Sequence, residues 1–507
     1  TLTAAPTEAL FKASGPTAQV YGQRDPTQLT GLEARVVATL RRISRELERG
    51  PMDADAAAMA MARDVCLGLA PTGPPPSRLV NFAMESNGLT EPPPHFVVAE
   101  VPFGVDSAML GELEQRFREI LGRGLYQRVG VALQVPRHGA NNRRLLVALM
   151  ESRVTLAPVP RRLVPGQEVT LNAQAGAGVS GLRLVVADPG GQITTTPLKD
   201  GQGLFACLTR GVYQVELTGD AEFGAEVVAN FPVYCDQAPP SEVRYPLSSG
   251  AAFNQEELER AVLQRTNEIR LNHGLPVLRP SLQLVRLARA HSTDMRDSGF
   301  VGHVSPSTGT PSDRLRKAGI THLLARENVA RGYGVEEIMS GLMNSPAHRE
   351  NLLGKDISEV GVGVAIDRTG SPPVLLVTQD FIKSGTALRP SAGVGPVLAE
   401  VARLRMEAGV SALIRDPRLE GIAAQVAEVL SEAGVDAEAR ARKTLNSALD
   451  GLGGRFKQVD SLQAKLSAVE ALAQASELIQ GRYTHTGVAV GGEAGKILLI
   501  VLLGVAR

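Results

Sequence analysis

A run of short alternating segments between residues 154 and 235 is the strongest constraint on how this chain can fold. Stretches such as VTLAPVP, EVTLNAQ, LRLVVAD and EVVANFPV change between apolar and polar residues at every second position, and PG, GG or DG turns separate them. This period is typical of strands that bury one face. We therefore expect an antiparallel β-sandwich of immunoglobulin-like type over residues 153–240.

The sequence before the β-region predicts a separate α/β domain over residues 28–152, because 507 residues are too many for one core. Helical periodicity runs from Leu32 to Leu69, and a second helix is expected from Met109 to Leu121. Two strand-like runs then end at Met150. Residues 1–27 are polar and irregular and are expected to be an extension without regular structure.

The sequence after the β-region predicts two further domains. Residues 239–250 are expected to be a linker. Residues 251–385 read as helices and loops followed by two strands. Residues 388–507 read as helices as far as Gln480, followed by two closing strands. The apolar run Ile497 to Leu503 is much shorter than the roughly 20 residues of a transmembrane helix and fits a buried final strand.

Three similar pieces indicate that one fold is used three times. LGRGLYQRVGVA, LGKDISEVGVGV and IQGRYTHTGVAV begin at Leu121, Leu353 and Ile479, and each precedes an apolar strand. The segment NEIRLNHGLPVL at Asn267 also matches ARLRMEAGVSAL at Ala402. We expect an α+β multidomain protein with three α/β/α-layered domains and the β-sandwich inserted after the first.

Composition narrows the function and the compartment. Lys and Arg total 53, and Asp and Glu also total 53, so nothing indicates a nucleic-acid surface. The Thr/Ala/Pro-rich start is expected to be what remains after removal of a signal peptide. Cys207 and Cys235 lie in the predicted β-domain and can form a disulfide in an oxidising compartment, which would leave Cys66 unpaired.

A histidine near a helix start is the first candidate functional residue. Ser345 is a good N-cap, and Pro346 suits the first helical position. His348 then lies in the first turn, where the positive end of the helix dipole disfavours a second positive charge. We expect a neutral imidazole, which can accept a hydrogen bond or bind a metal.

Seven motifs between Glu256 and Phe381 resemble the bacterial branch of the CAP superfamily, which comprises cysteine-rich secretory, antigen-five and pathogenesis-related proteins. They occur in family order: NEIR at 267–270, AHS at 290–292, GFVGH at 299–303, ENVA at 327–330, SPAHR at 345–349, EVGVG at 359–363 and TQDF at 378–381. The resemblance covers about a quarter of the chain.

Carried over residue by residue, the resemblance implies a cavity tetrad of His303, Glu327, His348 and Glu359. These residues would converge from two loops, a helix N-terminus and the start of a strand. Two imidazoles and two carboxylates are suitable ligands for a divalent metal, with zinc the natural choice. They can equally form a proton-bridged polar tetrad without metal, and the spacing does not decide between these alternatives.

The chain departs from the family pattern at several places. Arg326 stands where the family usually has glycine, and it could supply a compensating charge beside the tetrad. Aliphatic Leu342 and Val377 occupy positions that are commonly aromatic. In the flanking copies, Arg128 and His485 stand at the position of Glu359, so we expect these copies to be scaffolds.

The resulting hypothesis is an exported protein that acts as a binding or structural module at the cell surface, in the periplasm or outside the cell. Its partner would be an envelope or extracellular protein, peptide, glycan or lipid. One alternative is a metal-dependent hydrolase, a peptidase or nuclease, with Glu327 or Glu359 as general base. The other is a lipid-binding carrier. The sequence names neither the ligand nor the oligomeric state.

Overall fold

The computed structural model describes most of the chain. The described residues are 8–70, 73–102, 106–137, 142–247, 254–369, 372–384, 393–431, 436–452, 454–466, 468–493 and 496–506. The chain divides into two compact units. The first consists of residues 1–310, 327–355 and 360–380, and the second of residues 311–326, 356–359 and 381–507. None of the described helices is long and apolar enough to cross a membrane.

The first α/β region is a three-stranded sheet with helices on both faces. Its elements are α1 (Gly31–Glu46), α2 (Ala56–Leu67), α3 (Ser77–Ser86), β3 (His95–Val101), α4 (Asp106–Arg123), β4 (Arg128–Gln134) and β5 (Arg143–Met150). The sheet order is β3-β5-β4, and a single parallel bridge joins Asp53 to Arg128. Leu145, Val147 and Leu149 pack with α1 and α4, whereas the residues between them pack with α2 and α3. Strand alternation therefore separates two cores.

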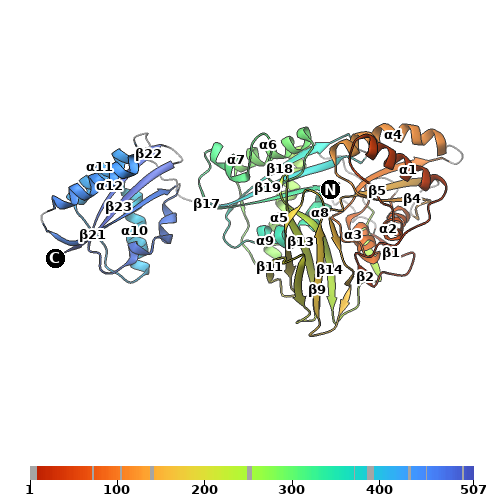
Figure 1. The fold of residues 1–507 in the computed structure, drawn as a ribbon, viewed down its shortest axis with the longest axis horizontal. Coiled ribbons are helices and arrows are strands. Elements are labelled where there is room, and N and C mark those ends of the chain that lie inside the picture. The colour runs from red at the N-terminus through yellow and green to blue at the C-terminus, as the bar shows by residue number, and fades with distance from the viewer. Residues whose placement is uncertain are drawn as a thin grey trace, which may run out of the picture. The chain divides into compact units, whose positions relative to one another are not determined.

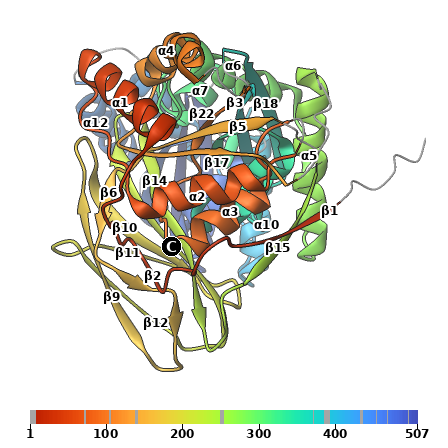
Figure 2. The ribbon, with the colours of Figure 1, turned by 90° about the vertical axis from the view of Figure 1, so that its right-hand side faces the viewer.

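The N-terminal segment contains a strand that the sequence analysis missed. β1 (Glu8–Lys12) pairs antiparallel with β15 (Glu242–Pro246), and Figure 2 shows the two side by side. The predictions of an irregular 1–27 and of a linker over 239–250 are wrong at these strands. Each strand is only five residues long, and its partner is more than 200 residues away, so no local pattern marks it. Ala9, Phe11 and Tyr245 are buried in the resulting cluster.

The β-region is built from two sheets. One has the order β11-β10-β13-β14-β8 and the other the order β12-β9-β6. The strands are β6 (Val154–Leu156), β8 (Arg162–Leu163), β9 (Glu168–Ala175), β10 (Ser180–Ala187), β11 (Ile193–Pro197), β12 (Gln202–Ala206), β13 (Gly211–Ala221) and β14 (Gly224–Cys235). Short strands β2 (Val20–Tyr21) and β7 (Val159–Pro160) also pair. One apolar core joins the sheets.

The predicted disulfide is confirmed. Cys207 and Cys235 are bonded, and their Cα atoms are 5.5 Å apart, within the usual disulfide range. The bond links the end of β12 to the end of β14, and therefore connects one sheet to the other. Cys66 is a free, buried cysteine, and burial raises the pKa of its thiol to about 12.

The central region contains a four-stranded sheet of order β16-β18-β19-β17. In Figure 1, α6 lies on one side of this sheet, and α5, α8 and α9 lie on the other. The elements are α5 (Gln255–Asn272), β16 (Arg279–Pro280), α6 (Leu282–Ser298), α7 (Pro311–Lys317), β17 (His322–Gly332), α8 (Val335–Asn344), α9 (Pro346–Leu352), β18 (Glu359–Asp367) and β19 (Val374–Ser384). β17 lies in a segment that the sequence analysis assigned to a loop.

The C-terminal region has the sheet order β20-β22-β23-β21. Its elements are α10 (Gly395–Glu407), β20 (Ile414–Arg415), α11 (Pro417–Ser431), α12 (Ala437–Asp450), β21 (Phe456–Leu466), the 3-10 helices η2 (Val469–Gln474) and η3 (Ser476–Ile479), β22 (His485–Glu493) and β23 (Lys496–Ala506). Alternate residues of β23 pack against α11 and α12 or against α10 and η2. The expectation that helices dominate as far as Gln480 is wrong at β21, an edge strand that pairs only with β23.

Candidate functional site

His303 and Glu327 form the best-defined pair of the site. His303 follows α6 in a loop that begins at Gly299, whose left-handed φ of 71° ends the helix. The imidazole Nδ1 lies 2.8 Å from Glu327 Oε1. The Glu327 side chain is only 2% exposed and that of His303 25%. Glu327 lies on β17 and not on a loop as expected, so a strand backbone fixes its position.

His348 lies in the first turn of α9, as the sequence predicted. Ser345 is the N-cap, and its hydroxyl lies 3.5 Å from the His348 backbone nitrogen and 2.9 Å from Nδ1. Removal of the ring from water, and then the nearby His303, lower the pKa of His348 to about 4. This direction agrees with the neutral imidazole expected from the sequence, and burial is the first cause of the lowered pKa.

Glu359 and Arg326 belong to the second compact unit. Glu359 is the first residue of β18, as expected, and its Oε1 accepts a hydrogen bond of 2.6 Å from the Ser384 hydroxyl. Arg326 forms an ion pair of 3.0 Å with Asp356. The structure thus joins His303 to Glu327 and places His348 near His303, while Glu359 is held by Ser384.

Sequence reasoning missed the amides that hold this site together. Asn351 Nδ2 donates to the Glu327 carbonyl over 3.1 Å and to Asn328 Oδ1 over 2.9 Å. Asn328 Nδ2 in turn lies 3.3 Å from the His348 carbonyl and 3.2 Å from Gln379 Oε1. Asn328 and Gln379 are fully buried. Their motifs, ENVA and TQDF, therefore contribute a polar network that ties β17 and β19 to α9.

Metal ligation by the candidate residues depends on how many of them converge. Among the described residues, no group of three or more His, Cys, Asp or Glu side chains is placed to hold a metal ion. Known catalytic zinc sites have three protein ligands and structural ones have four. His303, Glu327 and His348 are the candidate ligands that lie within one compact unit.

Other histidines have structural roles. His291 on α6 is 1% exposed, its Nε2 lies 2.9 Å from the Gly302 carbonyl, and its ring packs near Phe300. His291 is therefore a packed helix residue. His273 Nδ1 lies 2.8 Å from the Ile269 carbonyl at the end of α5.

The flanking regions have different chemistry at the position of Glu359. Arg128 begins β4, is buried, and donates to Asp55 and Glu91 at 2.5 Å each. His485 begins β22, and its ring meets Phe456 edge-on at 5.5 Å. Arg128 is thus held in a buried ion-pair cluster and His485 in a ring contact, and both arrangements are structural.

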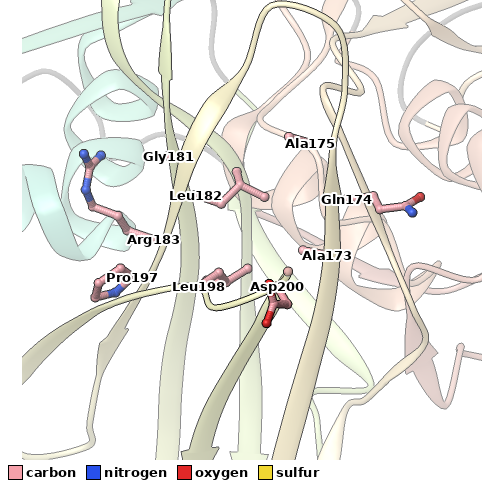
Figure 3. A pocket seen from close by; sticks show the side chains of 10 residues that line it. Ala173, Gln174, Ala175, Gly181, Leu182, Arg183, Pro197, Leu198 and Asp200 are labelled. Atoms are coloured by element: carbon pink, nitrogen blue, oxygen red, sulfur yellow. The ribbon is translucent and has the colours of Figure 1, made fainter.

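A cavity of about 480 Å³ lies in the β-sandwich and not at the tetrad. Figure 3 shows its lining, which includes Ala173, Leu182, Leu198 and Asp200 from the two sheets and their turns. None of the four candidate residues lines it. Most of its lining side chains are small or apolar, and it has no group of converging polar side chains.

Comparison with known proteins places a family domain at this site. Residues 263–381 match the model of the cysteine-rich secretory protein family, CAP. The uncharacterized protein YkwD of Bacillus subtilis is 32% identical over 172 residues, which is 34% of this chain and 65% of YkwD. The uncharacterized membrane protein YlbC of the same organism is 36% identical over 126 residues, 25% of this chain and 34% of YlbC. The chain thus spans less than two thirds of either curated relative.

Solved structures of other proteins also match part of this chain. An extracellular protein containing an SCP domain from Bacillus anthracis is 28% identical, with 35% of this chain and 66% of that chain covered and a TM-score of 0.24. An outer surface protein of Borrelia burgdorferi is 20% identical, with 27% and 99% covered and a TM-score of 0.24. The family match and the order of its motifs show that residues 263–381 form a CAP domain, within a mixed α/β multidomain chain.

Proposed function

We propose that this chain is a non-catalytic binding or structural module of the cell envelope or the extracellular space. The observation that carries the proposal is that each candidate residue is hydrogen-bonded within its own compact unit. His303 is bound to Glu327, His348 to Ser345 and Glu359 to Ser384. Polar groups that are held in this way are suited to shaping a rigid surface for a peptide or glycan partner.

We further propose that both flanking α/β regions are degenerate copies of the CAP domain. Their support begins with sheet order: β17-β19-β18-β16 in the centre corresponds to β21-β23-β22-β20 at the C-terminus. In the first region β3-β5-β4 has the same order, and the Asp53–Arg128 bridge stands where the fourth strand would be. Copies that lack the histidine pair favour surface building over turnover. The immunoglobulin-like assignment of the β-sandwich is part of the same proposal.

A hydrolase is the weaker alternative because Glu327, one of its two candidate bases, is poorly placed. Glu327 is 2% exposed and already accepts a hydrogen bond from His303, so its carboxylate is not presented to a substrate. The lipid carrier is the other alternative, and the cavity described in the sandwich does not include the candidate residues.

A bound divalent cation is kept as a separate proposal. The low pKa of His348 leaves its ring neutral at physiological pH, which is the ligating form. Two imidazoles alone do not complete a zinc centre, and we derive no reaction through a metal. Elemental analysis of the purified protein beside a His303→Ala, His348→Ala double variant tests this proposal.

An oxidising location is supported by the Cys207–Cys235 disulfide, since such bonds persist mainly outside the cytosol. It is consistent with the extracellular and surface locations in the names of the structural relatives, which are statements about those proteins.

Two measurements on the full chain test the proposed function. We expect the protein to co-sediment with insoluble peptidoglycan, and to turn over no peptide, ester or nucleic-acid substrate with or without added Zn²⁺. Turnover that His303→Ala abolishes would show that the site is catalytic. Sedimentation with phospholipid vesicles but not with peptidoglycan would favour the lipid alternative.

A further inference from the structure

One hairpin of the β-sandwich contacts the CAP domain beside both histidines. The hairpin consists of β13 and β14, joined at Glu222 and Phe223. It belongs to the same compact unit as His303 and His348, and β13 contacts α9 directly. The sandwich is therefore more than a spacer between the first and central regions.

The strands of the hairpin hold the start of α9. Glu216 on β13 is fully buried, and its Oε1 lies 3.4 Å from the Ala347 backbone nitrogen. It also accepts a hydrogen bond from the Ser345 side chain, the same residue that contacts the His348 ring. Burial raises the pKa of Glu216 to about 7, and its hydrogen bonds with Ser345, Ala347 and Asn230 oppose that rise.

A second strand residue reinforces this contact. Asn230 on β14 faces Glu216 across the hairpin, and its Nδ2 donates to Glu216 Oε2 over 3.1 Å. The same Nδ2 lies 3.1 Å from the Asn344 carbonyl at the end of α8. The hairpin therefore binds both sides of the α8–α9 junction, directly before His348.

The tip of the hairpin holds the other histidine. The Phe223 carbonyl accepts a hydrogen bond of 2.9 Å from Val304 N, and its ring packs against Phe300 with centroids 5.0 Å apart. Gly224 has a φ of 104°, and a Cβ added there would lie 3.3 Å from the His303 Cβ. A Cβ at Gly302 would lie 2.5 Å from the Phe223 Cβ. Both glycines thus allow the tip to approach the His303 loop closely.

From these contacts we infer that the β13–β14 hairpin is an intramolecular clamp on the histidine pair, with Glu216 and Phe223 as positioning residues for His348 and His303. One rigid two-stranded element contacts both histidine-bearing segments, so it sets how far apart they lie. The inference does not depend on which ligand the site takes. It assigns the sandwich a role in the CAP site that the family match, confined to residues 263–381, does not contain.

Glu216→Ala and Phe223→Ala in the full chain test the clamp. The readouts are the ring-proton NMR shifts of His303 and His348 and the hydrogen exchange of the Val304 and Ala347 amides. We expect Glu216→Ala to speed exchange at Ala347 at least tenfold and to shift the His348 signals. Phe223→Ala should do the same at Val304 and His303. Because Gln keeps an acceptor oxygen, Glu216→Gln should restore much of the Ala347 protection.

Matched controls come from the same sandwich. Asp220 is on β13 and forms a half-exposed ion pair with Arg183, and Leu208 is 78% exposed. Asp220→Ala and Leu208→Ala should leave both histidines unchanged. The clamp would be overturned if Glu216→Ala and Phe223→Ala left the histidine signals as in the wild type, or if exchange rose equally across the whole chain. Neither result would bear on peptidoglycan binding, which is measured separately.

A wedge variant is a second test that leaves both positioning residues intact. Gly302→Ala places a methyl group against the Phe223 Cβ and carbonyl, so the hairpin tip must move away. We expect His303 and Val304 to change as in Phe223→Ala while Ala347 stays protected. A wild-type His303 spectrum in a folded Gly302→Ala protein would also contradict the clamp.

Discussion

The central and C-terminal α/β regions share a framework but not a site. Arg270 on α5 is fully buried and donates to the carbonyls of Pro276, Leu352 and Gly354. Arg405 on α10 donates to the carbonyls of Ser411, Leu478, Gln480 and Tyr483. In both, the guanidinium fastens the first helix to the segment before the Gly-Val strand. Only the central region combines this brace with the histidine pair.

The first region makes the same brace from different residues. Ser44 on α1 is buried, and its hydroxyl donates to the Gly50 carbonyl, six residues on, as Arg270 and Arg405 do. The long side chain of Arg49 donates to the more distant Gly122 carbonyl. Carbonyls at this turn need a donor when they are buried. All three α/β regions therefore keep a hydrogen-bond donor for the carbonyls of this turn, although the flanking regions lack the histidine pair.

Removal of the brace should have the largest effect. Arg270→Ala and Arg405→Ala each leave at least three carbonyls without their charged donor, so we expect a loss of about 4 kcal/mol in the stability of the affected region. Hydrogen exchange at increasing urea measures this region by region. Arg265→Ala and Arg403→Ala remove solvent-exposed ion pairs on the same helices and should have a much smaller effect, because water screens such pairs. A small effect at Arg405 alone would break the comparison.

Glycines of the Gly-Val strands should have the next largest effect. A Cβ would lie 2.2 Å from the Ala58 carbonyl oxygen at Gly130, 2.1 Å from Leu284 C at Gly361 and 2.2 Å from Leu419 C at Gly487. Alanine must push a helix backbone from the sheet, at a cost of about 3 kcal/mol in each region. Gly111→Ala, Gly341→Ala and Gly421→Ala, on helices with open space, are controls that should be neutral or stabilising.

The pH dependence of stability should change when His348 of the central region is replaced. The unfolded chain protonates His348 near pH 6.5, but the folded one only near pH 4. Between about pH 6.5 and pH 4 the unfolded chain therefore binds up to about one more proton at His348 than the folded chain does. The free energy of unfolding falls as the pH falls through this range. The difference between wild type and His348→Gln isolates this contribution, because Glu216, whose raised pKa gives the opposite slope, is present in both. No difference between the two proteins would show that the ring titrates normally.

A reciprocal exchange should have the smallest effect. Glu359→His removes the acceptor of the Ser384 hydroxyl, and we expect a cost of about 1 kcal/mol. His485→Glu changes a residue that packs edge-on with Phe456, and we expect a change below about 0.5 kcal/mol. Thermal unfolding of both variants checks this. Equal costs would mean that position 485 is as constrained as position 359.

The sequence predicted the inner strands of each sheet better than the edges. The runs that became β5, β19 and β23 are apolar on both faces because helices cover both, so they are continuous and visible. β3, β17 and β21 lie at sheet edges and pair on one side only. They carry charged and polar residues, as in FKQVDSLQAKL, and were read as loop or helix or passed over.

At the candidate site, the sequence predicted the features that depend on adjacent residues. It did not predict which distant residues contact one another. Ser345 and Pro346 marked the start of α9 because capping depends on adjacent residues. The Asn328–Asn351–Gln379 network and Glu216 join elements that are tens to more than a hundred residues apart. No periodicity records such contacts. The glycines of the Gly-Val repeat were visible as a pattern, but only the helix backbones against them explain why glycine is needed.

The Cys207–Cys235 bond also has a consequence for the order in which the molecule matures. Cys235 is the last residue of β14 and pairs in register with Gly211, the first residue of β13. The bond is thus at the base of the hairpin whose tip reaches His303. In a newly made chain with reduced thiols, strand hydrogen bonds and core packing hold that base without the covalent link. On the proposed clamp, the histidine pair of a different domain is therefore fully held only after the thiols of the sandwich are joined.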